Sequence, residues 1–243
     1  MIALRKHPFP VEAFFEKSLV LGFALPKEEI EHRIPPRLEL DLLDEQWAFL
    51  AVALVKTRDL RPAGFPRIFG RDFTLIGYRI FVRYRNLAGR RLRGLYILGS
   101  ETDKLSMRAL GGIFTSYKYR HVSIDWSSGD QTESISSSEG LRVDASRFGG
   151  EIELPAESPF SDWREARRFA GPMPFTFSCD DERSVTLVEG VREKWTPVPM
   201  KITECEIPFF DGQKFCGLRL ANAFLVEKVS YQWRRGKVEI WPD

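Results

Sequence analysis

Stretches rich in Val, Ile, Leu and aromatic residues recur along the chain, and Pro, Gly, Asn or Asp bound them. This composition with these boundaries is typical of β-strands. Several stretches are apolar at both alternating positions, as is expected where both faces of a sheet are covered. The predicted strands are 17–25, 46–56, 73–84, 92–99, 117–126, 185–191, 200–209 and 228–233.

Helical signals are fewer. Residues 26–34 begin with a proline suited to a first helical position and carry acids in the first turn. In residues 100–110, Ser100 and Asp103 form a start similar to a capping box, and a Gly-Gly pair follows as a left-handed stop. Residues 161–169 open on a serine and predict a third, short helix.

Few helices among these strands predict a mostly β protein, either a barrel or a sandwich. No linker-like composition divides the chain, so we expect residues 1–243 to form a single domain. Lys and Arg together number 36, and Asp and Glu together number 34. This near balance gives no electrostatic reason to expect nucleic acid or an anionic membrane as a partner.

The N-terminal residues MIALRKHPFPVEAFFEK interrupt each apolar run with charges and prolines, so we expect no signal peptide. No apolar run approaches the ~18 residues of a membrane span. The cysteines Cys179, Cys205 and Cys216 are odd in number and form no CxxC pair, which fits a reducing compartment better than a disulfide scaffold. We therefore expect a cytoplasmic protein, and a homo-oligomer remains open.

The sequence lacks the common catalytic and metal-binding motifs. The histidines His7, His32 and His121 lie far apart, and no HExxH spacing occurs. There is no GxSxG elbow, no P-loop and no GxGxxG motif after a strand. Cys179 has no histidine nearby in sequence, which favours a structural thiol over a nucleophile. We expect neither a metal nor a cofactor.

Arg79 is a charged residue within LIGYRIFV, a predicted strand that is apolar on both faces. A guanidinium there has to be paired or has to face a polar cavity, because burying it without a partner costs several kcal/mol. One interpretation is an ion pair with a core carboxylate such as Glu101 or Glu189. The other is a carboxylate-binding arginine in a ligand pocket, which the bidentate guanidinium geometry suits.

Lys118 raises the same question in the predicted strand 117–126. Alternation places Lys118 on one face with Val122 and Trp126, and Tyr119 on the other. The lysine can extend harmlessly to solvent at the end of a barrel. It can instead be desolvated with a lowered pKa, which an amine needs to attack a carbonyl as a Schiff-base nucleophile.

The run GGIFTSYKYRHVSI, preceded by RAL, resembles the central element of the acetoacetate decarboxylase-like superfamily. Decarboxylases of that superfamily carry a helix ending in Arg-Glu-x-x-Gly-x-Pro-Lys-Lys, whose first lysine forms the Schiff base. Over residues 10–235 the chain resembles more closely an uncharacterised bacterial branch, a domain of unknown function. The matching pieces are LPKEEIEHRIPPRLELDLLDEQWAFLAVALV, GYRIFV, SYKYRHVSI and VEGVREKWTPVP. The resemblance implies a mostly β, acetoacetate decarboxylase-like barrel with a few short helices.

The resemblance places the Schiff-base lysine on Lys118, the second motif lysine on Tyr119 and the motif glutamate near Gly112. Without the second lysine, only desolvation remains to lower the pKa of the first. The resemblance thus implies an enzyme that acts on a small organic acid or carbonyl compound through Lys118, with weak or no acetoacetate turnover. Arg79, Tyr119 and Glu101 are the predicted ligand-binding residues. The alternatives are a non-catalytic protein that binds a small molecule in the same cavity, and an assembly protein whose barrel is filled by its own side chains.

Overall fold

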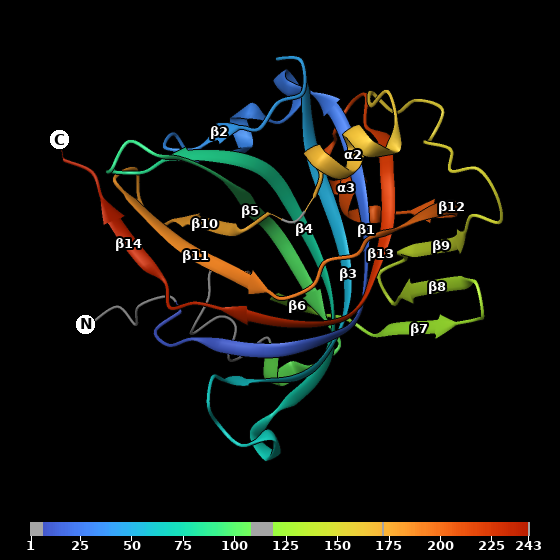
Figure 1. Ribbon diagram of the computed structural model, residues 1–243. Coiled ribbons are helices and arrows are strands. Elements are labelled where there is room, and N and C mark those ends of the chain that lie inside the picture. Colours follow the sequence, from blue (N-terminus) through green and yellow to red (C-terminus); the bar gives the residue numbers. More distant parts are fainter. Residues whose placement is uncertain (1–6, 108–118, 172, 243) are drawn as a thin grey trace.

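The computed structural model describes residues 7–107, 119–171 and 173–242. Most of these residues lie in strands (Figure 1). The strands are β1 (Val11–Pro26), β2 (Glu39–Leu40), β3 (Trp47–Pro62), β4 (Arg71–Arg85), β5 (Arg91–Thr102), β6 (Tyr119–His121), β7 (Ile124–Ser128), β8 (Thr132–Ser137), β9 (Arg142–Arg147), β10 (Phe175–Cys179), β11 (Ser184–Arg192), β12 (Val198–Glu206), β13 (Arg219–Trp233) and β14 (Lys237–Ile240).

Seven strands pair into a closed ring in the order β11, β10, β5, β4, β3, β1 and β13, and β13 returns to β11 through Gly190–Arg192. All pairs in the ring are antiparallel except β5 with β10. The mostly β fold predicted from the sequence is confirmed.

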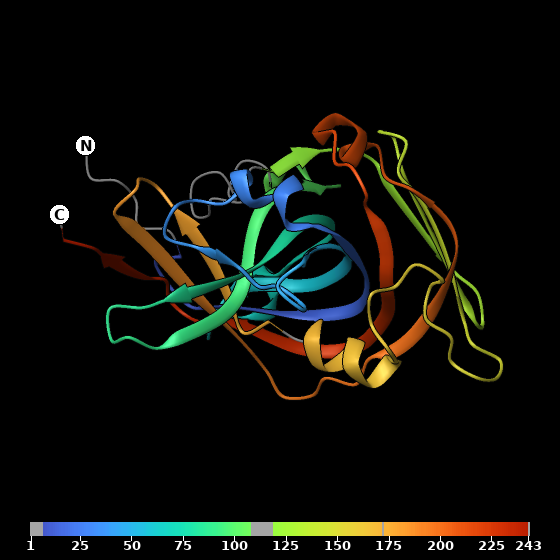
Figure 2. The same ribbon diagram turned by 90° about the horizontal axis from the view of Figure 1, so that it is seen from above.

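A second layer lies beside the ring. β12 pairs briefly with β13 and then with β9, which continues the sheet through β8 to β7. Figure 2 shows β7, β8 and β9 as a separate yellow-green layer. The main hydrophobic core lies between this layer and the ring, where Leu50, Val52 and Leu54 of β3 join a cluster that includes Ile135 and Val143.

The sequence of β3 explains why its two faces differ. Even-numbered positions carry the large side chains that enter the main core, since successive residues of a strand point to opposite faces. The odd-numbered positions carry Phe49, which packs in a second cluster with Phe81 and Phe160, and then Ala51 and Ala53, whose side chains are small. This face is therefore filled near Phe49 and has space above it near Ala53.

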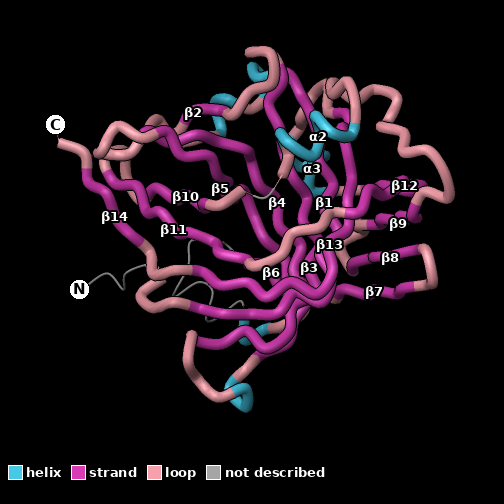
Figure 3. Tube along the Cα trace, in the orientation of Figure 1, coloured by secondary structure: helices cyan, strands magenta, loops and turns pink. Residues whose placement is uncertain are grey.

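Helices are few and short, as Figure 3 shows. α2 (Trp163–Phe169) confirms the helix predicted over 161–169, with Asp162 as its N-cap, because Asp162 accepts a hydrogen bond from the Glu165 N–H at 2.7 Å. α3 (Pro208–Gln213) and a 3₁₀ turn, η3 (Arg67–Phe69), are additional. The helix predicted over 26–34 consists of two 3₁₀ turns, η1 (Lys27–Glu29) and η2 (Glu31–Arg33). In the described part of the chain, no helix has the length and apolarity to span a membrane.

The helix predicted over 100–110 starts later than the sequence indicated, because β5 continues through Thr102. Residues 100–102 pair with β4 on one side and with β6 on the other, and helical residues begin only at 105. Asp103 does not cap a helix with Ser100 and instead accepts a hydrogen bond from the Thr74 N–H at 2.8 Å. Pairing on both sides satisfies more backbone groups than a local cap does. Residues 108–118 lie outside the described residues.

The strand predicted over 117–126 is two strands, β6 and β7. Between them, the Val122 N–H donates to the Thr102 carbonyl and the Ser123 N–H donates to the Ser138 hydroxyl. β6 pairs with β5 of the ring, whereas β7 pairs with β8 in the second layer. The alternation predicted for the strand 117–126 therefore does not continue from β6 into β7.

Candidate functional site

A cavity of about 470 Å³ is lined by residues from all seven strands of the ring, and we call it the Arg79 cavity. One row of paired residues crosses the sheet beneath it. The row consists of Phe224, Val20, Ala53, Gly77, Ser100 and Tyr119, from β13, β1, β3, β4, β5 and β6 in that order. Three small residues at the centre of the row leave the space above the sheet open.

Arg79 lies on β4, with its side chain folded back over Gly77. A Cβ atom at residue 77 would lie 3.0 Å from both Nε and Nη2 of Arg79, so the absence of a side chain gives the guanidinium its place. Gly77 pairs with Ser100, and Ser100 pairs with Tyr119. The guanidinium therefore lies beside the polar end of the row.

Arg79 makes no hydrogen bond and no ion pair with any residue of the described ranges, and its Nε atom is buried. Both carboxylates suggested as its partners are engaged elsewhere. Glu101 pairs with Arg120, and Glu189 pairs with Arg234 at 2.9 Å. The ion-pair interpretation of Arg79 with either residue is wrong.

The charge of the cavity wall is one-sided. Its four arginines are Arg61, Arg71, Arg79 and Arg192, and no Asp or Glu occurs among the described residues that line it. Arg61 is neutralised by ion pairs with two carboxylates outside the cavity wall. Arg79 and Arg192 have no such pair within the described part of the chain. The cavity therefore carries positive charge that an anionic ligand would balance.

A second polar corner lies where β11 ends. The guanidinium carbon of Arg192 lies 4.9 Å from the ring centroid of Trp195 and 5.6 Å from that of Tyr231, a cation–π arrangement. The Tyr231 hydroxyl lies directly over Gly190, where a Cβ atom would approach it to 1.9 Å.

Both tyrosines among the described residues of the cavity wall, Tyr119 and Tyr231, are neutral phenols near neutral pH. Burial raises the pKa of Tyr119 to about 12, although the charge of Arg79 acts in the opposite direction. Burial also raises the pKa of Tyr231, against the charges of Arg192 and Arg79. Each phenol can thus donate its proton in a hydrogen bond to a ligand oxygen.

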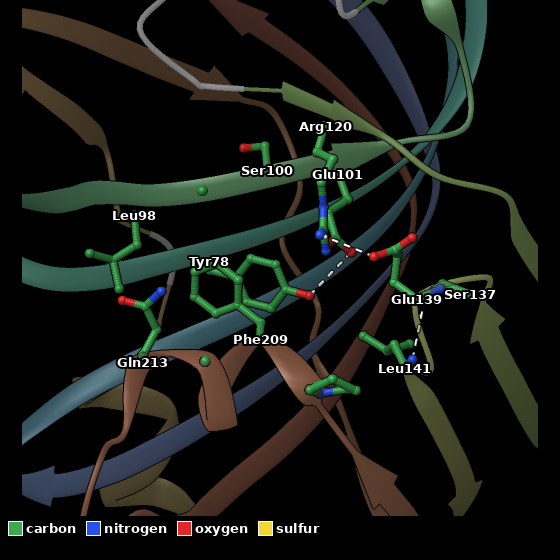
Figure 4. A pocket seen from close by; sticks show the side chains of 13 residues that line it. Tyr78, Leu98, Ser100, Glu101, Arg120, Ser137, Glu139, Leu141, Phe209 and Gln213 are labelled. Atoms are coloured by element: carbon green, nitrogen blue, oxygen red, sulfur yellow. Dashed lines mark hydrogen bonds and ion pairs between the residues drawn. The ribbon is translucent and has the colours of Figure 1, made fainter.

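Glu101 lies on the other face of β5 and lines a separate cavity of about 460 Å³, the Glu101 cavity (Figure 4). There it accepts hydrogen bonds from the Tyr78 hydroxyl at 3.3 Å and from Arg120. Arg120 also contacts Glu139 at 3.1 Å, and the ring of Phe209 stacks on Tyr78 with centroids 3.7 Å apart. The carboxylate is satisfied by the protein itself.

The structure thus divides the predicted site residues. Arg79 and Tyr119 line one cavity, Glu101 lines the other, and Lys118 lies outside the described residues. Met107 also lines the Arg79 cavity.

Arg192, Trp195 and Tyr231 also line this cavity and were not predicted from the sequence. The rule that singled out Arg79 would have found Arg192, because it ends a strand-like run within VEGVREKW, one of the pieces quoted for the resemblance. Tyr231 carries no local signal, since its role depends on the position of Gly190 on a neighbouring strand. Within residues 7–107, 119–171 and 173–242, no group of three His, Cys, Asp or Glu side chains is placed to hold a metal ion.

Similar folds occur among solved structures of acetoacetate decarboxylase-like enzymes. The acetoacetate decarboxylase of Legionella pneumophila is 12% identical, with a TM-score of 0.58 over 94% of this chain and 86% of that one. An acetoacetate decarboxylase-like enzyme from Sphingomonas wittichii is 10% identical, with a TM-score of 0.56 over 97% and 93%. The enduracididine biosynthesis enzyme MppR, solved with the condensation product of pyruvate and imidazole 4-carboxaldehyde, is 11% identical, with a TM-score of 0.55 over 95% and 89%.

These likenesses define the fold class as acetoacetate decarboxylase-like, as the resemblance implied. Within that class, residues 13–229 match DUF2071, a family described as an uncharacterized conserved protein, and the chain belongs to this family. A search of curated proteins gave no match. Because the solved structures share so little sequence with the chain, they establish its fold and leave its activity to the site.

Proposed function

We propose that the protein binds a small organic acid in the Arg79 cavity, with the carboxylate on the guanidinium of Arg79. The observation that carries this proposal is a guanidinium without a carboxylate partner among the described residues, in a cavity wall that has no described acid. A ligand carboxylate supplies the missing charge and accepts two parallel N–H bonds from arginine. Burial makes these charge-assisted bonds stronger than they would be at the surface.

Neighbouring groups suit the rest of an acid that carries a carbonyl or hydroxyl. The Tyr119 phenol and the Ser100 hydroxyl lie in register on adjacent strands, beside Arg79. Both can donate to a ligand oxygen a few ångströms from the carboxylate. This combination favours a keto or hydroxy acid.

Catalysis is the second part of the proposal and concerns Lys118. The resemblance assigns the Schiff-base nucleophile to this residue, which precedes Tyr119 in the chain. With a keto acid, the lysine amine would attack the carbonyl carbon and water would leave, which gives an imine. A 3-oxo acid would then lose CO₂, with the electron pair of the broken C–C bond moving toward the imine nitrogen, and water would release the product.

Titration calorimetry with Arg79→Gln tests the binding step. The probes are a carboxylic acid and its methyl ester, which differ only in the charge that Arg79 is proposed to hold. We expect Arg79→Gln to weaken acid binding by roughly 10- to 100-fold, the effect of losing hydrogen bonds to a charged group. Arg91→Gln is the matched control, because Arg91 is an exposed arginine at the start of β5 that pairs only with Glu39 at 3.4 Å among the described residues. Equal losses in both variants, or no preference for acid over ester, would contradict the proposal.

Borohydride reduction in the presence of keto acids tests the catalytic step, followed by mass spectrometry of the peptide that contains residue 118. An adduct on Lys118 supports the enzyme. Acid binding through Arg79 without an adduct from any keto acid favours the non-catalytic binding protein.

A further inference from the structure

We infer that the acid bound by the Arg79 cavity carries an aromatic or similarly bulky apolar body, and that three- to five-carbon acids are not its main ligands. This inference rests on the proposed function, since it assigns Arg79 to the carboxylate. It adds the class of acid, which the size and the wall of the cavity determine.

The volume of the Arg79 cavity exceeds what a small acid needs. Cavities of roughly 300–1,000 Å³ hold ligands the size of drugs and cofactors, and the Arg79 cavity, at about 470 Å³, lies within this range. At about 30 Å³ for each water molecule in the liquid, the cavity has the volume of roughly sixteen waters. An acid with about seven non-hydrogen atoms would fill less than half of it. The remainder would stay wet against an apolar wall.

Part of the cavity wall is aromatic. The rings of Phe15 and Tyr231 stack with centroids 4.8 Å apart, and Trp233 lies 4.5 Å from Tyr231. Trp195 and Phe224 form a second aromatic pair with centroids 6.0 Å apart. All five residues line the cavity. A ring or branched apolar group fits such a wall by stacked or edge-to-face contacts.

Arg79 and the aromatic residues occupy different parts of the sheet. Arg79 lies above Gly77 near the centre of the row, whereas Phe224 lies three strands away at one end of it. At about 4.8 Å between neighbouring strands, three strands correspond to roughly 14 Å measured along the curved sheet. A short acid held by Arg79 leaves most of this stretch of wall uncovered, whereas an acid with a ring on a short chain covers more of it.

The test is a series of 2-oxo acids with one head group and bodies of increasing size: pyruvate, phenylpyruvate and indole-3-pyruvate. Dissociation constants are measured by calorimetry on the wild-type protein. We expect phenylpyruvate to bind at least 10-fold more tightly than pyruvate, because burial of a benzyl group contributes roughly that factor or more. Indole-3-pyruvate is expected to bind at least as tightly as phenylpyruvate.

A variant that fills the cavity makes the test specific. Ala53→Leu adds bulk at the centre of the row and is expected to weaken phenylpyruvate binding at least 10-fold, with pyruvate affected less than threefold. Thermal melting of the variant confirms that it is folded. The wild-type series decides the question by itself should Ala53→Leu fail to fold.

The outcomes separate this inference from the proposed function. Equal dissociation constants for the three acids, together with loss of binding in Arg79→Gln, would overturn the inference and leave the proposed function in place. Equal binding of phenylpyruvate and the uncharged 2-phenylethanol, unaffected by Arg79→Gln, would overturn the proposed function and this inference with it. No binding of any probe would overturn both.

Discussion

Replacement of Glu101 separates a structural role from the ligand-binding role predicted for it. Its side chain is 5% exposed, and it accepts hydrogen bonds from Tyr78 and Arg120 (Figure 4). Glu101→Ala leaves the hydroxyl of Tyr78, a residue that is 1% exposed, without its acceptor, which costs about 1–3 kcal/mol. Arg120 is 55% exposed, so water screens its pair with Glu101 and loss of that pair adds at most about 1 kcal/mol.

Together these effects lower the free energy of unfolding by roughly 1–4 kcal/mol. For a chain of this length, each kcal/mol shifts the melting temperature by about 2–4 °C, so we expect a decrease of roughly 2–16 °C. Glu101→Gln keeps an acceptor for Tyr78 and is expected to cost about 1 kcal/mol. Differential scanning calorimetry measures both variants.

Glu139→Gln is the matched control, because Glu139 contacts the same arginine but is 48% exposed. Its unfolding free energy is expected to stay within about 0.5 kcal/mol of the wild type. Two results would refute the reasoning. Either Glu101→Gln would destabilise as much as Glu101→Ala, or Glu101→Ala would keep its stability and lose the binding of organic acids.

Two further predictions concern Gly190 and His7. Gly190→Ala places a Cβ atom 1.9 Å from the present position of the Tyr231 hydroxyl, so the ring has to move, and we expect acid binding measured by calorimetry to weaken roughly 10-fold. Gly149→Ala, where a Cβ atom meets nothing within 4 Å, serves as the control and is expected to change nothing. Burial lowers the pKa of His7 from 6.5 to about 4, so the unfolded chain takes up this proton first as the pH falls. The contribution to stability, about 3 kcal/mol, is complete above pH 6.5 and is lost toward pH 4. Melting temperatures across this range should fall less steeply in His7→Gln than in the wild type, and the exposed His121→Gln should not differ from the wild type.

Six of the seven ring strands were predicted from the sequence, because they are long and carry large apolar side chains on at least one face. The seventh, β10, is only five residues long and was missed. β8 and β9 were missed, since their sequences, TESISS and RVDASR, are mostly polar and bury only alternate residues such as Ile135 and Val143. An alternation of buried and exposed residues this short cannot be distinguished from a loop by the sequence alone. They are recognisable only once the neighbouring layer is known.

Residues 100–110 show how local and tertiary signals can conflict. A serine followed three residues later by an acid is a common start of a helix, but Ser100 is paired through its backbone to Gly77 and Tyr119. Such pairing depends on strands that are distant in sequence. A local motif therefore placed the start of the helix several residues too early.

The candidate site was predictable in its chemistry but not in its partners. Arg79 was identified from the sequence because a charged side chain in an apolar strand needs a partner or a polar surrounding. Its partner could not be inferred, because Glu101 and Arg79 lie on adjacent strands with their side chains on opposite faces. A bulge between Tyr78 and Arg79 further shifts the register that alternation would have used.

The lack of a partner for Arg79 among the described residues predicts an effect on stability opposite to that of Glu101. If Arg79 paired with a carboxylate of the protein, Arg79→Met would leave that carboxylate without its partner and would be destabilising. No described residue pairs with the guanidinium. In the ligand-free protein the partly buried cation instead lowers stability, because its desolvation is not offset. Arg79→Met is therefore expected to raise the unfolding free energy of the free protein by roughly 1 kcal/mol, as replacements of buried charges by apolar residues often do. It should also abolish the increase in melting temperature that a bound acid produces in the wild type. A melting temperature several degrees below that of the wild type, measured without ligand, would show that the protein itself already satisfies the guanidinium and that no acid is needed to do so.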